Sequence, residues 1–482
     1  MKTIFKTLAL CFLPLLSASQ QKTYVPDDNF EQRLINMGFD NILDDSVTTY
    51  SLSILTSLNL EYQNIVDMTG IEDFVSLEVL SCENNQIQTL DVSNLPDLEY
   101  LNCYANQLTS LDLSNNPNLT NLNCSYNLIT SLDLSNNPNL TDLDCSTNNL
   151  GSLDVSQNTT LIYLSCGDNQ LSSLDVSQQV YLESLSCGEN QLSSLDVSQQ
   201  IYLEFLGCEE NQLSSLDISN NTSLYILKTY YNQLSNLDLL QNINLVDLHC
   251  DNNQITSLDL SQNVNLHSLS CNLNQLDSLD VSANTNLTQL HCYGNQITSL
   301  DVSQNINLES FHCDSNQVTS LDVSQNSNLI TFWCRYNNQL SYLDLRNGNN
   351  TSLLFYDLCL TDNPNLYCIS VDDTTWSNAN WTVFGNNIDP HHYFSANCYT
   401  PPPASWDCIA GACVDSGNGT GMYTTLAACQ TACITNSIEE QQYTKELISI
   451  TDIFGRESKP QPNTPLFYRY SDGTVEKKLI IE

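Results

Sequence analysis

The cysteines are spaced so regularly that they suggest a common chemical or structural role. Of the 20 cysteines, twelve follow one another at intervals of 21 residues or, once, 42. Regularly repeated cysteines can ligate metal ions, form disulfides or pack as small apolar side chains. The twelve, called the ladder cysteines below, are Cys82, Cys103, Cys124, Cys145, Cys166, Cys187, Cys208, Cys250, Cys271, Cys292, Cys313 and Cys334.

Packing explains the ladder cysteines better than metal or disulfide chemistry does. Each follows a leucine or phenylalanine by two positions, as Cys103 follows Leu101, which is the alternation of a half-buried strand. Stacked parallel strands place neighbouring Cβ atoms about 4.8 Å apart, farther than the roughly 3.5–4.5 Å of a disulfide. Zinc-type pairs of closely spaced ligands are absent from the repeats. We predict buried thiols, with a metal cluster or partial bridging as the alternatives.

Aspartate forms a second series with the same period as far as Asp322. Carboxylates about 5 Å apart repel one another unless each is hydrogen-bonded or shares a cation. The series is therefore either a calcium-binding edge or a row of acceptors for backbone N–H groups of the following turn. We favour the second because calcium-binding repeats usually carry several carboxylates and glycines per turn. The series is Asp91, Asp112, Asp133, Asp154, Asp175, Asp196, Asp217, Asp238, Asp259, Asp280, Asp301, Asp322 and Asp344.

Side chains for catalysis are present but form no recognisable constellation. The sequence contains no Gly-rich phosphate loop, no nucleophile elbow and no His-Glu-x-x-His motif. Serine is abundant only because every repeat uses it. We therefore predict a protein that is not an enzyme and holds no cofactor, with an unrecognised hydrolase site as a remote alternative. The six histidines are His249, His267, His291, His312, His391 and His392.

The elements that must position these residues are the coils of a solenoid. Around each ladder cysteine runs Leu-x-x-Leu-x-Cys-x-x-Asn-x-Leu-x-x-Leu-Asp-apolar-Ser, as in residues 98–114. This pattern is similar to the leucine-rich repeat, with cysteine in one leucine position. The resemblance implies a mainly β, α/β-type solenoid with parallel strands on its concave face. Residues 58–366 provide about fifteen coils, and stacking at about 4.8 Å makes a rod on the order of 70 Å long.

Two segments precede the solenoid. Residues 1–19 read as a secretory signal, with a basic start, a short apolar stretch and a small-residue cleavage site. Residues 20–57 form an N-terminal cap whose Phe30, Leu34 and Met37 share one helical face. Residues 24–30 and 69–74 resemble the start of secreted bacterial leucine-rich-repeat proteins of the internalin type.

Cysteines also organise the segments that follow the solenoid. Residues 367–400 resemble the terminal cap of flavobacterial leucine-rich-repeat proteins, and we expect Cys368 and Cys398 to bridge there, leaving Cys359 unpaired. Residues 401–436 hold a proline linker and a small disulfide module, whose four cysteines allow three pairings. Similarity to the closing half of Kunitz-like modules favours pairing the outer two and the inner two. These four are Cys408, Cys413, Cys429 and Cys433.

Residues 437–482 alternate apolar and polar residues around turn signals, which predicts a small antiparallel β domain. Asp452-x-x-Gly455-Arg456 and the closing Lys477-Lys478-apolar strand resemble the C-terminal sorting domain of Bacteroidetes type IX secretion cargo. The resemblance implies delivery by the type IX secretion machinery, so that the protein is secreted or attached to the outer-membrane surface. An anonymous β cap is the alternative.

The net charge of the chain disfavours some classes of binding partner. The chain carries 13 Lys+Arg against 55 Asp+Glu, a net charge of −42. Such a chain repels phosphate backbones and anionic lipid, which disfavours nucleic acid and membrane surfaces. No segment after the signal reads as transmembrane. We expect an exported, water-soluble monomer.

Outward positions beside the ladder cysteines are the predicted binding face. From coil 229 onward, these positions change from small polar residues to aromatic, histidine and charged residues, the composition of a recognition surface. We predict recognition of a protein or glycan ligand there; a structural or calcium-responsive surface spacer or adhesin is the alternative. The predicted contacts are Lys228, Tyr230, His249, Asp251, His291, Tyr293, His312, Asp314, Trp333 and Arg335.

Overall fold

The computed structural model describes residues 21–354, 357–398, 406–409, 412–415, 447–452, 456–460, 465–471 and 474–479. Residues 1–399 and 400–482 form two separate compact units. The expected signal at 1–19 and most of the expected disulfide module lie outside the described residues. No helix in the described ranges combines the length and apolar character that crossing a membrane requires.

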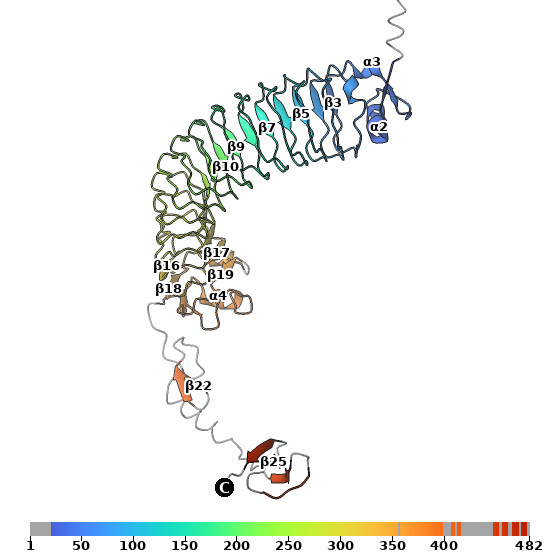
Figure 1. Ribbon diagram of the computed structural model, residues 1–482. Helices are drawn as coiled ribbons and strands as arrows, with labels where there is room; N and C mark the ends of the chain where they lie inside the picture. Colours follow the sequence, from blue (N-terminus) through green and yellow to red (C-terminus); the bar gives the residue numbers. More distant parts are fainter. Residues whose placement is uncertain are drawn as a thin grey trace, which may run out of the picture. The chain divides into compact units, whose positions relative to one another are not determined.

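A parallel sheet of fifteen strands runs the length of the first unit (Figure 1). Strands of consecutive coils pair in register 21 residues apart, so that Leu101 of one coil lies beside Leu122 of the next. The predicted leucine-rich-repeat solenoid is thus confirmed. The strands are β3 (Ser57–Asn59), β4 (Val79–Ser81), β5 (Tyr100–Asn102), β6 (Asn121–Asn123), β7 (Asp142–Asp144), β8 (Tyr163–Ser165), β9 (Ser184–Ser186), β10 (Phe205–Gly207), β11 (Ile226–Lys228), β12 (Asp247–His249), β13 (Ser268–Ser270), β14 (Gln289–His291), β15 (Ser310–His312), β17 (Thr331–Trp333) and β19 (Leu358–Cys359).

The ladder cysteines line the interior beside these strands. All twelve are buried and unbridged, as the packing interpretation predicts. Burial raises the pKa of the Cys82 and Cys166 thiols to about 12, so both remain protonated at neutral pH. Thr229 occupies the missing ladder position and is also fully buried.

An asparagine turns the chain away from each strand and joins neighbouring coils. The Nδ2 of Asn190 donates to the carbonyl oxygens of Cys166, Cys187 and Gly188, at 3.1–3.2 Å. Its Oδ1 accepts the N–H of Leu171 in the preceding coil at 2.9 Å. One side chain thus partners four backbone groups.

The residue before that asparagine adopts the left-handed conformation in most coils. It is glycine only at Gly294 in the regular repeats, and φ is 50° at Ala105, 51° at Thr147 and 53° at Glu189. A left-handed non-glycine residue costs about 1 kcal/mol. The four bonds of the following asparagine offset this cost and fix the turn.

A second asparagine ladder crosses the buried return path of the coil. Asn116 is fully buried, and its Nδ2 donates to the carbonyls of Val92 and Leu95 in the preceding coil, at 3.0 and 2.8 Å. Gln179 and Gln200 take this position in two coils and also donate to the coil before. The sequence analysis did not identify this ladder.

The aspartate series lies on the return path of the coil, after the strand, and each member accepts a backbone N–H. Asp133 Oδ1 accepts the N–H of Ser135 at 3.0 Å, and the other members bond the residue two positions on in the same way. Hydrogen bonds from Ser135 lower the pKa of Asp133. The backbone-acceptor interpretation is therefore confirmed by the hydrogen bonds.

The N-terminal cap is built around a short helix, α2 (Asp28–Asn36). Asp27 accepts the N–H groups of Asn29 and Phe30, and the predicted apolar face buries Phe30 and Leu34. Around the helix lie β1 (Lys22–Tyr24), paired antiparallel with β2 (Ser46–Thr48), then α3 (Thr49–Leu52) and η1 (Ile71–Asp73).

The C-terminal cap adds a second parallel sheet and a disulfide. The sheet consists of β16 (Ser320–Asp322), β18 (Tyr342–Asp344), β20 (Cys368–Ser370) and β21 (Tyr393–Ser395), and η2 (Asn350–Ser352) and α4 (Thr374–Asn380) accompany it. Cys368 is bonded to Cys398, as the sequence analysis expects. Trp381 is fully buried and donates from Nε1 to the carbonyl of Leu353 at 2.9 Å.

The described residues of the second unit form two small antiparallel sheets. In the hairpin of β22 (Trp406–Ile409) and β23 (Ala412–Asp415), Cys408 lies opposite Cys413. Cys429 and Cys433 lie outside the described residues, so the nested pairing stays a prediction. The other sheet, of β24 (Leu447–Thr451), β25 (Pro465–Tyr470) and β26 (Val475–Leu479), has the predicted antiparallel form.

Replacing Asn190 by Ala is expected to destabilise the solenoid by about 2–4 kcal/mol, because it leaves buried backbone groups without partners. Gln191→Ala is the matched control, because the Gln191 side chain is exposed in the same coil. The measurement is the midpoint of urea unfolding for the two variants and the wild type. Equal midpoints for all three proteins would contradict the bonding role of the asparagine ladder.

Candidate ligand-binding face

Each strand of the long sheet presents three outward columns of side chains. Relative to the ladder cysteine, the first column lies three residues before it, the second one residue before it and the third one residue after it. The strand register aligns the second column from Lys228 through His249 to Trp333. The register thus makes these predicted residues neighbours across consecutive coils. Cys359 extends the same column, beside Trp333, as a half-buried thiol.

Three rings of the second column form a continuous stack. The ring centroids of His291 and His312 are 4.3 Å apart with an interplanar angle of 10°. Those of His312 and Trp333 are 4.5 Å apart at 7°. The ring spacing nearly matches the strand spacing of about 4.8 Å, so the stack follows directly from the register.

An ion pair closes the far end of this stack. Arg335 donates from Nε to Asp314 Oδ1 at 2.9 Å, and the same oxygen accepts the Arg335 N–H. The guanidinium carbon lies 5.3 Å from the Trp333 ring centroid and 5.9 Å from that of Tyr336. Arg335 is therefore held by a carboxylate and two aromatic rings at once.

The other predicted residues form a separate group around β11 and β12. His249 Nε2 lies 2.9 Å from Asp247 Oδ1, in the first column. Lys228 Nζ lies 5.7 Å from the Phe205 ring centroid, and Tyr230 meets the ring of Tyr231 edge-on at 6.0 Å.

Ser270, which has a small side chain, separates the two groups in the second column. Its hydroxyl donates to Asp251 Oδ1, which also accepts from the backbone and side-chain N–H groups of Asn272. Asn272 Oδ1 in turn accepts the N–H of Tyr293 at 2.9 Å. The third column is thus linked from coil to coil through its own side chains.

The histidines of the face differ in pKa because their surroundings differ. Burial, with smaller contributions from His291 and Arg335, lowers the pKa of His312 to about 4. Burial also lowers the pKa of His291, whereas the hydrogen bond to Asp247 raises the pKa of His249. At neutral pH the stacked imidazoles are therefore uncharged, which removes repulsion between them.

A further hollow on this sheet was missed by the sequence analysis, which considered only the second and third columns. It has a volume of about 270 Å³ and lies on β5 to β9. The sequence feature that could have revealed it is the pair Tyr100 and Tyr163, which lie in the first column three coils apart. We call it the tyrosine hollow; it is lined by Tyr100, Asn121, Leu122, Asn123, Asp142, Leu143, Asp144, Tyr163, Leu164, Ser165, Ser184 and Ser186.

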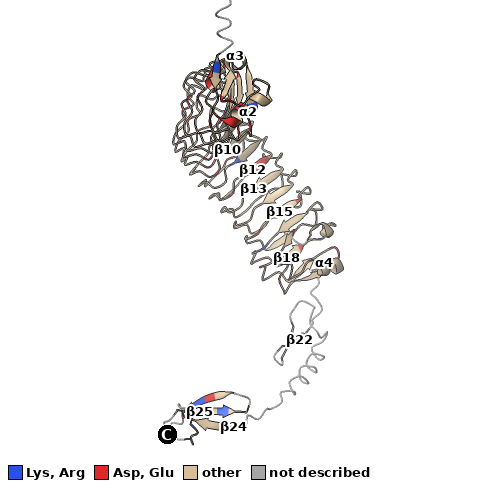
Figure 2. Cartoon of the chain, turned by 90° about the vertical axis from the view of Figure 1, so that its right-hand side faces the viewer, with Lys and Arg blue, Asp and Glu red and all other residues tan. Residues whose placement is uncertain are grey.

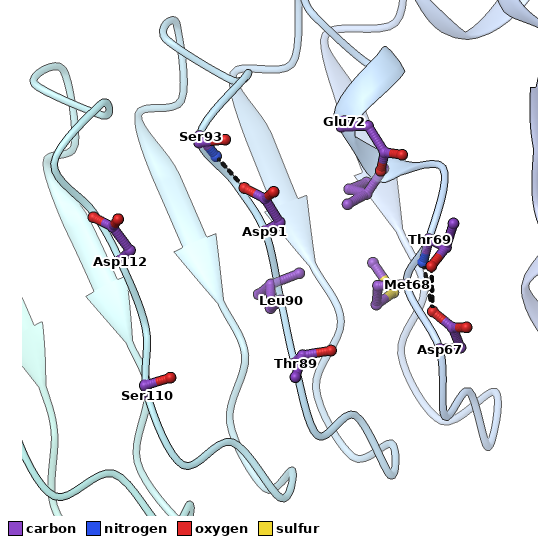
Figure 3. A pocket seen from close by; sticks show the side chains of 11 residues that line it. Asp67, Met68, Thr69, Glu72, Thr89, Leu90, Asp91, Ser93, Ser110 and Asp112 are labelled. Atoms are coloured by element: carbon purple, nitrogen blue, oxygen red, sulfur yellow. Dashed lines mark hydrogen bonds between the residues drawn. The ribbon is translucent and has the colours of Figure 1, made fainter.

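Another hollow, of about 490 Å³, lies among the first members of the aspartate series (Figure 3). Its carboxylates already have partners: Asp91 Oδ1 accepts the N–H of Ser93 at 2.9 Å, and Asp67 Oδ1 that of Thr69 at 2.8 Å. Hydrogen bonds from Ser93 lower the pKa of Asp91. Bonds within the chain therefore account for these acids without a calcium ion.

One group of potential metal ligands lies in the C-terminal cap, at Asp389, His391 and His392. Nδ1 of His392 accepts the Asp389 N–H at 3.2 Å, and burial lowers the pKa of His392 to about 4. The neutral ring therefore carries its proton on Nε2, which lies 3.4 Å from Asp389 Oδ2. These contacts serve the packing of the cap and leave His392 no free lone pair for a metal.

A second group is Glu31, Asp40 and Asp44 in the N-terminal cap. The buried Glu31 carboxylate accepts the N–H groups of Asp44, Asp45 and Ser46 at 3.0–3.1 Å. These bonds hold the loop that follows α2.

Comparison with known proteins identifies the repeat. Residues 75–116 match the family model described as leucine-rich repeats in two copies. Internalin J of Listeria monocytogenes is 38% identical over 81 residues, which are 16% of this chain and 9% of that protein. The matched segment therefore spans less than a tenth of this relative's length.

Solved structures extend the similarity to the whole array. One described as the functional domain of InlJ from Listeria monocytogenes, which includes a cysteine ladder, is similar with a TM-score of 0.70 and 28% identity, covering 96% of this chain and 99% of that one. An internalin of Listeria monocytogenes has a TM-score of 0.57 at 24% identity, covering 66% and 95% of the two chains. A leucine-rich-repeat protein of Leptospira interrogans has a TM-score of 0.56 at 23% identity, covering 71% and 93%. The last two show the shared fold.

Replacing Trp333 by Ser is expected to raise the pKa of His312 from about 4 towards its ordinary value of 6.5, because the imidazole loses the ring that buries it. Proton NMR titration of the histidine ring signals measures this shift. His249 serves as the internal control, because its pKa depends on Asp247. An unchanged His312 titration in the variant would contradict the stacked arrangement.

Proposed function

We propose that this internalin-like leucine-rich-repeat protein is a non-catalytic recognition protein that binds a protein ligand through the outward columns of β11 to β19. The observation that carries the proposal is the ring stack of His291, His312 and Trp333, closed by the Arg335–Asp314 ion pair. Structural coils need none of these side chains, because the interior and the asparagine ladders hold the solenoid together.

The composition of this surface suits a protein ligand. Aromatic residues and arginine are enriched at the centres of protein interfaces, where they supply most of the binding energy. Trp333 Nε1 and His312 Nε2 are enclosed without a hydrogen-bond partner in the described part of the chain. An unpaired buried polar atom of this kind costs about 1–3 kcal/mol of stability. A ligand group that hydrogen-bonds to either ring, after that ring turns outward, would recover this free energy.

The spacer alternative has less support. A calcium-responsive rod would need these carboxylates as ligands, and one oxygen of each already accepts a backbone N–H group. A glycan remains the other ligand class for this face, because sugar rings stack on aromatic side chains. The similarity to Listeria internalins supports a bacterial surface or secreted location.

A variant with Tyr230, His291, Tyr293, His312 and Trp333 all replaced by Ser is expected to fold normally and to lose ligand binding, because these side chains point away from the interior. Binding is measured with the mature chain against panels of purified surface proteins and of glycans. The control variant is Tyr50→Ser with Tyr62→Ser, which removes exposed rings near the N-terminal end. Full binding by the five-serine variant would show that the binding site lies elsewhere on the molecule.

Delivery is the second part of the proposal: residues 437–482 act as an address for type IX secretion. The Asp452–Arg456 motif is internally bonded, with Arg456 Nε and N–H donating to the Asp452 carboxylate, both at 3.0 Å. Such an internally bonded pair is a defined feature for secretion machinery to recognise. The three strands also differ in charge from the acidic solenoid, because Arg469, Lys477 and Lys478 lie on them.

Deleting residues 437–482 in the native host is expected to leave the solenoid folded but retained in the periplasm. Cell fractionation with antibody detection measures the distribution. The control is the variant with Tyr50→Ser and Tyr62→Ser, which changes exposed side chains outside residues 437–482. Unchanged delivery of the deleted protein to the surface or medium would refute the sorting role.

A further inference from the structure

The tyrosine hollow is the part of the sheet that the proposed site leaves unexplained. It lies on β5 to β9, nearer the N-terminal end of the array than the ring stack (Figure 1). Two of the residues that line it are Tyr100 and Tyr163, which are 38% and 48% exposed. Three coil steps separate them, or about 14 Å. The strands themselves close the hollow from below, because their central leucines point into the interior, so its sides and outer rim decide what it binds.

Two carboxylates stand between the tyrosines. Asp142 Oδ2 accepts the Thr141 hydroxyl at 2.7 Å, and Asp144 Oδ1 accepts the Ser146 N–H at 3.0 Å. These bonds orient the carboxylates but neutralise neither charge. In the described part of the chain, ion pairs involve other acids.

Basic side chains are almost absent from the whole array. Lys228, Arg335 and Arg346 are the only ones in residues 58–366, and blue is correspondingly sparse along the strands in Figure 2. The carboxylates of the hollow therefore have no basic side chain of the array beside them to neutralise them. Any such cation must come from outside the array.

The sheet itself shows how its surface holds a cation. Arg335 lies between the Asp314 carboxylate and the ring of Trp333. Lys228 lies against the ring of Phe205; burial raises the pKa of the Glu209 carboxyl, and the charge of Lys228 opposes this in part. Arg335 thus shows a basic side chain held by a carboxylate and an aromatic ring together. The tyrosine hollow offers both surfaces and lacks the basic side chain.

We propose that the tyrosine hollow binds arginine side chains presented by the protein ligand. This inference rests on the proposed function and names the chemistry of the partner. A guanidinium can donate two parallel N–H bonds to Asp142 or Asp144 while its plane lies against Tyr100 or Tyr163. The net charge of −42 repels a second copy of this chain and any anionic ligand, and it attracts a basic one.

The test uses the full mature chain and a short peptide with two arginines separated by glycine. Its neutral control replaces both arginines by citrulline, which keeps the shape and removes the charge. Titration calorimetry at low salt is expected to show binding of the arginine peptide in the millimolar to high micromolar range. Binding should weaken as salt rises, because the interaction is between charges. Absence of binding, or equal binding of the citrulline peptide, overturns the proposal.

Variants locate the peptide on the molecule. Asp142→Asn combined with Asp144→Asn is expected to weaken binding at least tenfold, and Tyr163→Ala several-fold. The matched control is Asp97→Asn combined with Asp277→Asn, which removes the same charge at exposed positions outside the hollow. Circular dichroism confirms that each variant is folded. Equal weakening by the control pair would show attraction to net charge alone and overturn the assignment of the hollow.

Two results keep this inference separate from the proposed function. The five-serine variant of the ring stack should bind the arginine peptide as the wild type does. If the peptide fails to bind while that variant still loses the protein ligand, the hollow is wrong and the recognition face stands. If a neutral oligosaccharide such as chitotriose binds in the hollow and the peptide does not, the hollow is a glycan site and the arginine assignment is wrong.

Discussion

Hydrogen bonding of the backbone between coils is the constraint on which the rest of the structure depends. A coil of 21 residues leaves many N–H and C=O groups that no local helix or hairpin satisfies. The parallel sheet pairs those at the strands, and the two asparagine ladders pair those at the turns, where Asn190 alone serves four groups. Because the strand pairs and part of the asparagine bonds cross from one coil to the next, no coil is stable by itself.

This division of labour leaves the outer columns free to carry function. Leucines and ladder cysteines fill the interior, and asparagines and aspartates hold the turns, so the positions between them can change without disturbing either. The ring stack shows the result, since the sheet register sets the spacing of His291, His312 and Trp333. The scaffold determines where a side chain stands, and the sequence at that position determines what it binds.

The sequence predicted the fold almost completely because each structural role repeats many times. A single Asn or Asp is ambiguous, but twelve or thirteen at one spacing are not. Site features were less predictable, because each occurs once. Column neighbours such as His291 and His312 followed from the period, whereas the stacking of their rings depends on side-chain rotamers. The tyrosine hollow was missed because the first column carries Tyr100 and Tyr163 far apart in sequence, and only the strand register shows that they bound one space.

Because the coils are uniform, the length of the array can change only in steps of one coil. Insertion or loss of 21 residues restores every asparagine bond with the new neighbour, so the chain can lengthen or shorten without repacking its core. Each such event moves the tyrosine hollow and the ring stack apart or together by about 4.8 Å. The number of coils between the tyrosine hollow and the ring stack thus sets the distance between these two contact points. This distance can be matched to the size of a partner without changing the side chains that make the contacts.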